Sequence, residues 1–309
     1  MNNYKQVIRD LEDKYKNINV VKNDIVAFQK FKNYNMVYNK FQIAVDQNLK
    51  CGICPIIPDE YPVVLKPIYN LIGMGIDSIK IKSKKEFLKN SKNGNFWTKF
   101  LVGNHISWDL IIRDGIIIYH VPFHGHKKTF GTFNYWEEIY EEIPKNVRML
   151  VNKYFKNFTG NVNMETIGNK VIEVHLRMGD IDLVDYDIIK LSVLNQIEKN
   201  DEEIIRQMKI INSKKKKIKN IYLVPVWEKL DIKSSFTKQK NLLYKKYEYI
   251  KQLQDILEDD DLIEGYYIDD PEHPNPIGYK RWFLLLSKNL KDTIKLKNKF
   301  ERLIKNHQV

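Results

Sequence analysis

A β-hairpin in the middle of the chain constrains the fold more than any other feature. Val162 to Ile167 and Val171 to Leu176 are strand-like runs, and Gly168-Asn169 between them is a typical hairpin turn. Earlier runs have the same strand character, so the middle of the protein is predicted to be a sheet. These runs are Tyr61 to Leu65, Ile76 to Ile81, Phe96 to Val102, and Ser107 to Arg113, which Asp114-Gly115 joins to Ile116-Ile117-Ile118.

The same hairpin carries acidic and basic side chains at a spacing of two. Glu173, His175 and Arg177 share one face of their strand, because side chains alternate between the two faces. A loop of only two residues would put Glu165 and Glu173 on opposite faces, whereas a three-residue loop or an equivalent bulge would align them. We predict the aligned register, with Glu165, Glu173 and His175 facing the cleft that also contains Lys66.

Helical periodicity dominates the two ends of the chain. Tyr4 to Lys16 reads as an amphipathic helix, and the apolar residues from Val20 to Ile25 read as a strand. Ser83, three residues before Glu86, has capping-box spacing and predicts a helix start. The run Tyr135 to Phe155 is predicted as a helix. From Ile188 onward the pattern is mainly helical, interrupted by the strand-like Ile221 to Val226.

Composition narrows the class of protein. The 309 residues are 43% apolar, which is sufficient for a buried core, and the net charge of +12 favours anionic partners such as phosphates, nucleotides or nucleic acid. The first residues, Met1 to Lys16, lack the apolar stretch of a signal peptide. We therefore expect a soluble, cytoplasmic protein, in the host cytoplasm if the source is viral.

Two lysines and a glycine loop are suited to binding phosphate. Lys40 follows a Tyr-Asn pair, Lys66 ends a strand, and the loop Gly73-Met74-Gly75 follows it. Glycines let backbone N–H groups approach phosphate oxygens closely, and lysines supply compensating charge. The alternative is that the loop is a plain hairpin connection.

The acidic residues of the later hairpin are suited to binding a metal. Carboxylate oxygens of Glu165 and Glu173 are the hard ligands that Mg2+ prefers when it also bridges nucleotide phosphates. Arg177 is placed to neutralise charge on a transferring phosphoryl group. The alternative is an exposed strand face with alternating charges.

The order of these motifs resembles the ATP-grasp superfamily over roughly residues 36 to 180. The resemblance implies an α+β, ATP-grasp-like, two-lobed fold of antiparallel sheets with helices, plus a helical C-terminal extension. It further implies that ATP is bound by Lys40, Lys66, the loop Gly73, Met74 and Gly75, and the hinge Lys99, Phe100 and Leu101. Glu165, Glu173 and His175 would hold magnesium, with Arg177 and Lys66 in catalysis.

Two departures from the family pattern bear on this expectation. The family usually has Glu-x-Asn-x-Arg where this chain has Glu173-x-His175-x-Arg177, and an acidic residue near the hinge where this chain has Thr98 and Lys99. Imidazole is a poorer Mg2+ ligand than an amide oxygen, so His175 either weakens one metal position or favours Mn2+. The second departure removes a ribose contact.

The resemblance implies a domain organisation and an activity. We expect a short segment at residues 1–35, an N-lobe with the glycine loop at 36–100, a C-lobe with the metal site at 101–195, and a mainly helical extension at 196–309. The implied activity is an ATP-dependent ligase that activates a carboxylate as an acyl phosphate for attack by an amine. Its partners would be ATP and an unidentified small-molecule or peptide acceptor. The alternatives are a kinase with the same fold and a non-enzymatic, basic nucleic-acid-binding protein.

Three further features each have a functional and a structural interpretation. Cys51 and Cys54 with His120, His124 and His126 could form a zinc site or simply lie apart. The run Lys214 to Lys217 could touch nucleic acid or be a solvated loop. The Pro-rich acidic stretch from Asp269 to Pro276, followed by Tyr279 to Trp282, could line an acceptor pocket or tie the last helix to the body; we favour the structural role.

Overall fold

The computed structural model describes residues 3–12, 14–15, 21, 23–72, 75–129, 131–198, 200–215, 220–230, 236–258, 260–273, 275 and 278–307. The chain divides into two compact units. We call Val21–His124 with Tyr140–Gly179 the site unit, and Met1–Val20 with Gly125–Ile139 and Asp180–Val309 the terminal unit. No helix within the described ranges is both long and apolar enough to cross a membrane.

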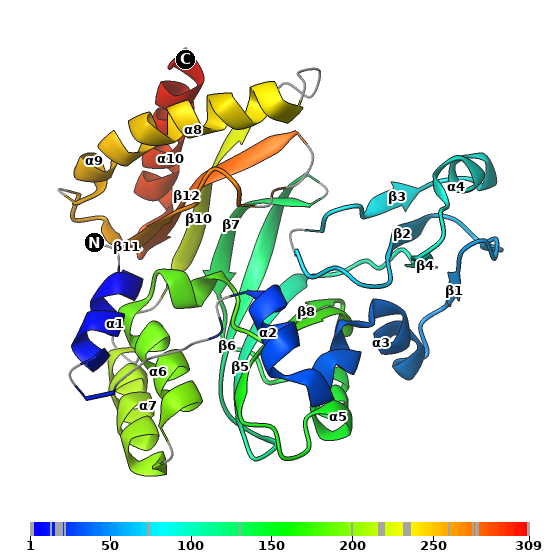
Figure 1. Ribbon diagram of the computed structural model, residues 1–309, viewed down its shortest axis with the longest axis horizontal. Helices are drawn as coiled ribbons and strands as arrows, with labels where there is room; N and C mark the ends of the chain where they lie inside the picture. Colours follow the sequence, from blue (N-terminus) through cyan, green and yellow to red (C-terminus); the bar gives the residue numbers. More distant parts are fainter. Residues whose placement is uncertain are drawn as a thin grey trace. The chain divides into compact units, whose positions relative to one another are not determined.

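The site unit contains a small antiparallel sheet (Figure 1). Its described strands are hydrogen-bonded in the order β1-β4-β2-β3. The helix α4 (Lys84–Asn90) covers it through buried Phe87 and begins as the capping-box spacing predicts: Ser83 Oγ accepts the Glu86 N–H at 3.2 Å. The strand bounds are β1 Cys51–Ile53, β2 Val63–Pro67, β3 Ile79–Ile81 and β4 Asn95–Lys99.

Longer strands of a second sheet also belong to the site unit. They are ordered β6-β5-β8-β9, with bounds β5 His105–Arg113, β6 Ile116–Thr129, β8 Gly160–Ile167 and β9 Lys170–His175. Asp114 and Gly115 turn β5 into β6 with φ of 48° and 80°, as the hairpin signal predicts. In addition to α4, the described part of this unit contains four helices: α2 Asp24–Lys30, the 3-10 helix η1 Lys32–Tyr38, α3 Lys40–Asp46 and α5 Lys145–Tyr154.

Strand alternation divides this sheet into an apolar and a polar face. Trp108, Leu110, Val162 and Met164 are fully buried on one face, because they occupy alternate positions of neighbouring strands. The residues between them are polar and face the other side. The sheet therefore supplies a rigid surface on which functional side chains can be held.

The terminal unit combines strands with helices. Next to the last residues of β6, the sheet continues with strands in the order β7, β10, β12 and β11. The helices α8 and α10 lie against these strands (Figure 1). The core contains fully buried Trp282, Phe283 and Phe300. The bounds are α1 Asn3–Glu12, β7 Thr132–Glu138, η2 Asp180–Leu183, α6 Tyr186–Ile197, α7 Asp201–Lys215, β10 Tyr222–Lys229, α8 Phe236–Gln252, α9 Gln254–Glu258, β11 Ile263–Ile268, β12 Tyr279–Ser287 and α10 Leu290–Asn306.

The structure corrects two predicted elements. The helix predicted over Tyr135 to Phe155 is wrong in its first part, which is strand β7, and right in its last part, which is α5. Pro144 caps α5 and would break a longer helix. The strand predicted up to Ile25 is also wrong: α2 begins at Asp24, where the Asn23 side chain accepts the Val26 N–H at 2.9 Å.

Helices and antiparallel sheets together confirm the predicted α+β class. The extension predicted as mainly helical contains α7 to α10, and it also contains the strands β10, β11 and β12. Of these, only β10 was predicted.

Candidate functional site

The candidate site lies on the polar face of strands β5, β8 and β9 in the site unit. Two rows of residues pair across the strands, and paired residues project from the same face. Asn163 Nδ2 donates to Asp109 Oδ1 at 2.8 Å and to Ser107 Oγ at 2.7 Å. The first row is Ser107, Glu165 and Glu173, and the second is Asp109, Asn163 and His175.

A bulge in β9 produces this alignment. Gly168 and Asn169 form the turn, with φ of 54° and 66°, so the loop itself has only two residues. Thr166 pairs with Val171 but Glu165 pairs with Glu173, which leaves Ile172 as an extra residue on β9. The expectation of a longer loop or an equivalent bulge is therefore confirmed in its second form.

Both predicted phosphate-binding lysines reach β9. Lys40 begins α3, and its Nζ lies 2.5 Å from Glu173 Oε1. Lys66, on β2, donates from Nζ to the backbone oxygen of the bulged residue Ile172 at 3.0 Å. Burial, together with the positive charge of Lys40, lowers the pKa of Lys66 to about 8 although Glu173 and Glu165 oppose this.

Glu165 has a histidine partner that the sequence did not reveal. His105 Nε2 lies 2.8 Å from Glu165 Oε2. Burial acts to raise the pKa of Glu165, but the hydrogen bond and charge of His105, with the charges of His175 and Lys40, lower it to about 2. Glu165 is therefore an ionised carboxylate at neutral pH.

Asp24 contacts two further residues that were predicted for the site, His175 and Arg177. Its carboxylate is 1% exposed and its Oδ2 lies 2.9 Å from His175 Nδ1 and accepts from Arg177 Nε at 3.1 Å. Tyr38 donates its hydroxyl to Asp24 Oδ1 at 3.0 Å. Burial acts to raise the pKa of Asp24, but the charges of His175 and Arg177 hold it well below its usual range.

The glycine loop and the hinge are described only in part. Gly73 and Met74 lie outside the described residues, whereas Gly75 is in the left-handed region with φ of 61°. Lys99 ends β4, and Phe100 lies under the Lys80 ammonium at 3.8 Å from the ring centroid. Leu101 follows and is half-buried.

The described residues contain no group of three or more His, Cys, Asp or Glu side chains that could hold a metal ion. The predicted set of Glu165, Glu173 and His175 is thus not assembled as a three-ligand protein site. The alternative zinc set is not assembled either, and Cys51 and Cys54 are free thiols. A cation that arrives with a nucleotide needs only one or two protein carboxylates, because phosphates and water supply its other ligands. Glu165 and Glu173 fit that requirement, since they are paired on one face.

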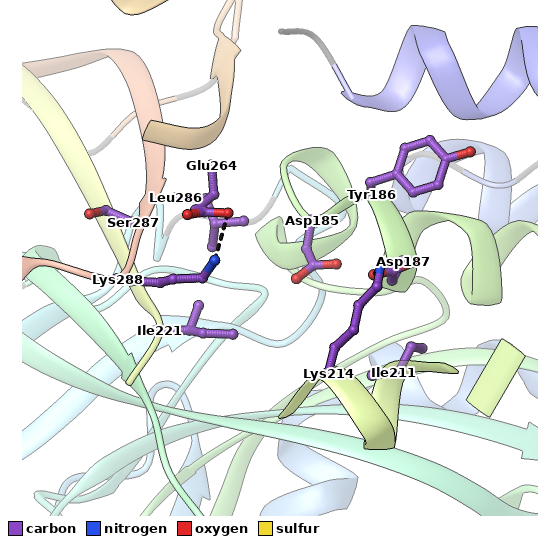
Figure 2. Close-up of a pocket in the computed structure, with 10 residues that line it drawn as sticks. All are labelled: Asp185, Tyr186, Asp187, Ile211, Lys214, Ile221, Glu264, Leu286, Ser287 and Lys288. Atoms are coloured by element: carbon purple, nitrogen blue, oxygen red, sulfur yellow. Dashed lines mark hydrogen bonds and ion pairs between the residues drawn. The ribbon is translucent and has the colours of Figure 1, made fainter. Parts of the chain in front are cut away.

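Lys214, the first residue of the basic run, lines a pocket in the terminal unit, and Lys216 and Lys217 lie outside the described residues (Figure 2). Lys214 pairs with Asp187 at 2.5 Å, and on the opposite wall Lys288 pairs with Glu264 at 2.8 Å. The lysine is therefore engaged by a carboxylate of its own chain. The full lining is Asp185, Tyr186, Asp187, Ile211, Lys214, Ile221, Glu264, Leu286, Ser287 and Lys288.

The acidic stretch after β11 makes buried ion pairs within the terminal unit. Asp269 is 0% exposed and accepts from Arg281 Nε at 2.6 Å, and Arg281 also binds Asp180. Lys280 donates to the Asp270 backbone oxygen at 2.6 Å. These contacts favour the structural role for this stretch.

Solved structures with a similar fold were found by structural comparison. The chain superposes on a carboxyaminoimidazole ribonucleotide synthase from Aspergillus clavatus complexed with ATP with a TM-score of 0.55 and 6% identity, over 96% of this chain and 78% of that one. An L-amino acid ligase from Bacillus licheniformis gives a TM-score of 0.51 and 12% identity, over 89% and 72%. This chain has the ATP-grasp fold. No protein-family model and no curated protein matches the sequence.

Two residues of the candidate site, Asp24 and His105, were not predicted from the sequence. Asp24 lies about 150 positions from His175, so no local spacing connects them. The link between His105 and Glu165 depends on the pairing of β5 with β8, which no local spacing predicts. The sequence shows only that His105, Ser107 and Asp109 are spaced by two, which places them on one face of a strand.

Proposed function

We propose that this protein is an ATP-dependent ligase that activates a carboxylate with ATP and joins it to an amine. The observation that carries the proposal is the convergence of Lys40 and Lys66 on β9, which also bears Glu173. The ATP-grasp fold supports it, because the similar structures named above are a ligase and a synthase.

The charges of the site suit a polyphosphate. Lys40, Lys66 and Arg177 supply basic side chains, and Lys66 is largely protonated below its pKa of about 8. The carboxylates of Asp24, Glu165 and Glu173 partly offset their charge. Phosphate oxygens would replace the Ile172 oxygen and the Glu173 carboxylate as partners of the two lysines. Each such contact is a charge-assisted hydrogen bond.

The remaining predicted residues would have the following roles. Lys99, Phe100 and Leu101 would lie beside the adenine, and Gly73, Met74 and Gly75 would cover the phosphates. Glu165 and Glu173 would hold the divalent cation, which offsets phosphate charge when bound. Arg177 is fixed through Asp24 and would stabilise negative charge on the transferring phosphoryl group.

The reaction proceeds in two displacements. A carboxylate oxygen of the acceptor attacks the γ-phosphorus and ADP leaves, which gives an acyl phosphate. The amine nitrogen then attacks the acyl carbon and inorganic phosphate leaves. The protein contributes mainly positioning and charge neutralisation.

A screen for acceptor-dependent ADP release tests this function. The full chain is incubated with MgATP and with pairs of carboxylic acids and amines, beginning with L-amino acids. ADP and phosphate that form only when both partners are present support the ligase. ADP that forms with an alcohol or a phosphate acceptor and without free phosphate would instead identify a kinase. Steeply salt-dependent binding to DNA or RNA without ATP turnover would identify a nucleic-acid-binding protein.

A further inference from the structure

Three successive residues of β9 are each held by a side chain that comes from outside its sheet. Lys66 and Lys40 make two of these contacts, and both lysines belong to the proposed ATP site. The third contact is made by Gln47, an uncharged residue directly after α3. The three pairs are Val171 with Gln47, Ile172 with Lys66, and Glu173 with Lys40.

The Gln47 amide takes the place of a neighbouring strand at the outer edge of β9. Its Oε1 accepts the Val171 N–H at 2.7 Å, and its Nε2 donates to the Val171 oxygen at 2.8 Å. A residue of a paired strand makes the same two bonds. Gln47 is 3% exposed and Val171 is 1% exposed, so water has little access to these backbone groups. Nε2 also donates to the Ile43 oxygen at 2.9 Å, which fixes the amide on its own helix.

The bulge of β9 lies between the contacts of Gln47 and Lys40. Val171 and Glu173 face opposite sides of the sheet because Ile172 is inserted between them, whereas residues two apart in a regular strand share a face. Lys40 begins α3 and Gln47 directly follows its last residue, so the two are seven positions apart and lie on the same side of the helix. A single helix therefore holds the bulge at both ends.

Nucleotide binding changes the balance among the three contacts. In the proposed ATP complex, phosphate oxygens replace the β9 partners of Lys66 and Lys40. Gln47 has no charge that would draw it to phosphate, so its bonds to Val171 persist. The alignment of Glu165 with Glu173 depends on the bulge, and the bulge therefore has to persist in the complex. Of the three side chains, Gln47 is the one that continues to hold it.

We infer that Gln47 is a positioning residue of the proposed ATP site, which holds the β9 bulge in place when Lys66 and Lys40 turn to the nucleotide. The inference rests on the proposed function. Gln47 acts through Val171 and does not itself contact the nucleotide. Its loss lowers ATP affinity because the bound state then has to keep the bulge without any of the three contacts.

Isothermal titration with MgATP tests the inference on the full chain. Gln47→Leu has a similar volume but neither hydrogen bond, and it should weaken MgATP binding about five- to tenfold, the factor that one net hydrogen bond carries. Gln42→Leu is the matched control, since it is the same substitution on the same helix and Gln42 donates to Asp46 at 2.8 Å instead of to β9. It should leave the Kd unchanged. Circular dichroism confirms that both variants are folded.

A double-mutant cycle with Lys66→Ala separates positioning from a general loss of stability. Without Lys66, nucleotide binding withdraws one contact fewer from the bulge. Gln47→Leu should therefore weaken MgATP binding by only about twofold in the Lys66→Ala background. Equal factors in the two backgrounds would overturn the inference, because a merely structural role does not depend on Lys66.

Hydrogen exchange at single residues, measured on the wild type by NMR, requires no variant and decides the matter if Gln47→Leu does not fold. The Val171 amide should exchange slowly in the free protein and equally slowly with saturating MgATP, because its bond to Gln47 persists. Fast exchange of this amide in the complex would overturn the inference.

The possible failures are distinguishable. If the wild type binds MgATP and a folded Gln47→Leu variant binds it equally well, the inference is wrong and the proposed function stands. If the folded wild type does not bind MgATP, the proposed function fails, and this inference fails with it.

Discussion

Glu165 and Glu173 are direct cross-strand partners although only two residues, Gly168 and Asn169, connect their strands. The bulge at Ile172 makes this possible, because one extra residue on β9 restores the alignment that a two-residue loop would destroy. The same bulged residue offers its backbone oxygen to Lys66 at 3.0 Å. A single irregularity therefore brings together the two carboxylates and the lysine.

Replacement of Lys66 should weaken nucleotide binding. The ammonium is buried and would bind phosphate through a charge-assisted hydrogen bond, so Lys66→Ala should cost about 1 to 3 kcal/mol of ATP binding free energy. Isothermal titration calorimetry gives the Kd directly. Lys89→Ala, which removes an exposed lysine of α4, is the matched control and should leave the Kd unchanged. Equal Kd values for Lys66→Ala and wild type would remove Lys66 from the site.

ATP affinity should fall as pH rises above 8. The pKa of Lys66 is lowered to about 8 by burial and by Lys40, against the opposing charges of Glu173 and Glu165. Lys66 is mostly charged at pH 7 and mostly neutral at pH 9, and a polyanion binds the charged form, so the Kd should rise about tenfold over that interval. Lys66→Arg keeps its charge and should flatten the profile. A wild-type Kd that is constant from pH 7 to 9 would contradict this role.

The hairpin turn should not tolerate a side chain at Gly168. Its φ is 54°, and an added Cβ would lie 2.6 Å from the Val102 backbone oxygen. Gly168→Ala should therefore lower the free energy of unfolding by about 1 to 3 kcal/mol, as measured by urea denaturation. Asn169→Gly, at the next turn position, should change stability little, because glycine adopts its φ of 66° freely. A fully stable Gly168→Ala variant would show that the turn can relax.

The ion pair between Asp269 and Arg281 should be required for stability of the terminal unit. Asp269→Ala leaves the buried Arg281 guanidinium with one carboxylate partner fewer, and loss of a partner in a buried pair costs about 3 to 5 kcal/mol. Thermal unfolding measures this loss. Asp255→Asn, an exposed position on α9, should alter stability by less than about 0.5 kcal/mol. An Asp269→Ala variant as stable as Asp255→Asn would assign the pair no structural role.

Local signals predicted much of the site unit. The turns Asp114-Gly115 and Gly168-Asn169 and the cap at Ser83 are each specified by a few neighbouring residues, and all three occur as predicted. The aligned register of Glu165 and Glu173 followed from the requirement that they share one face. The position of the bulge at Ile172 could not be predicted, because it depends on how the residues beyond the turn pair across the two strands.

Long-range packing decided the elements that the sequence did not predict. Trp282 to Leu286 is an apolar run that suits a buried strand or a buried helix equally, and only its pairing with β10 and β11 makes it a strand. Asp24 lies within the stretch from Val20 to Ile25 that was predicted as a strand. Its contacts with His175 and Arg177 depend on a fold that joins distant segments. The polar residues that escaped prediction are those whose partners lie far away in sequence.

The effect of MgATP and MnATP on thermal unfolding of the full chain tests the central claim, a nucleotide site built on β9, most directly. A ligand that binds only the folded state stabilises it by mass action, by about 2.7 kcal/mol at one hundred times its Kd. We predict that the Tm rises with nucleotide concentration, and that Lys66→Ala shifts this rise to higher concentrations. A wild-type Tm that stays constant at millimolar nucleotide with either cation would contradict the site and the function built on it.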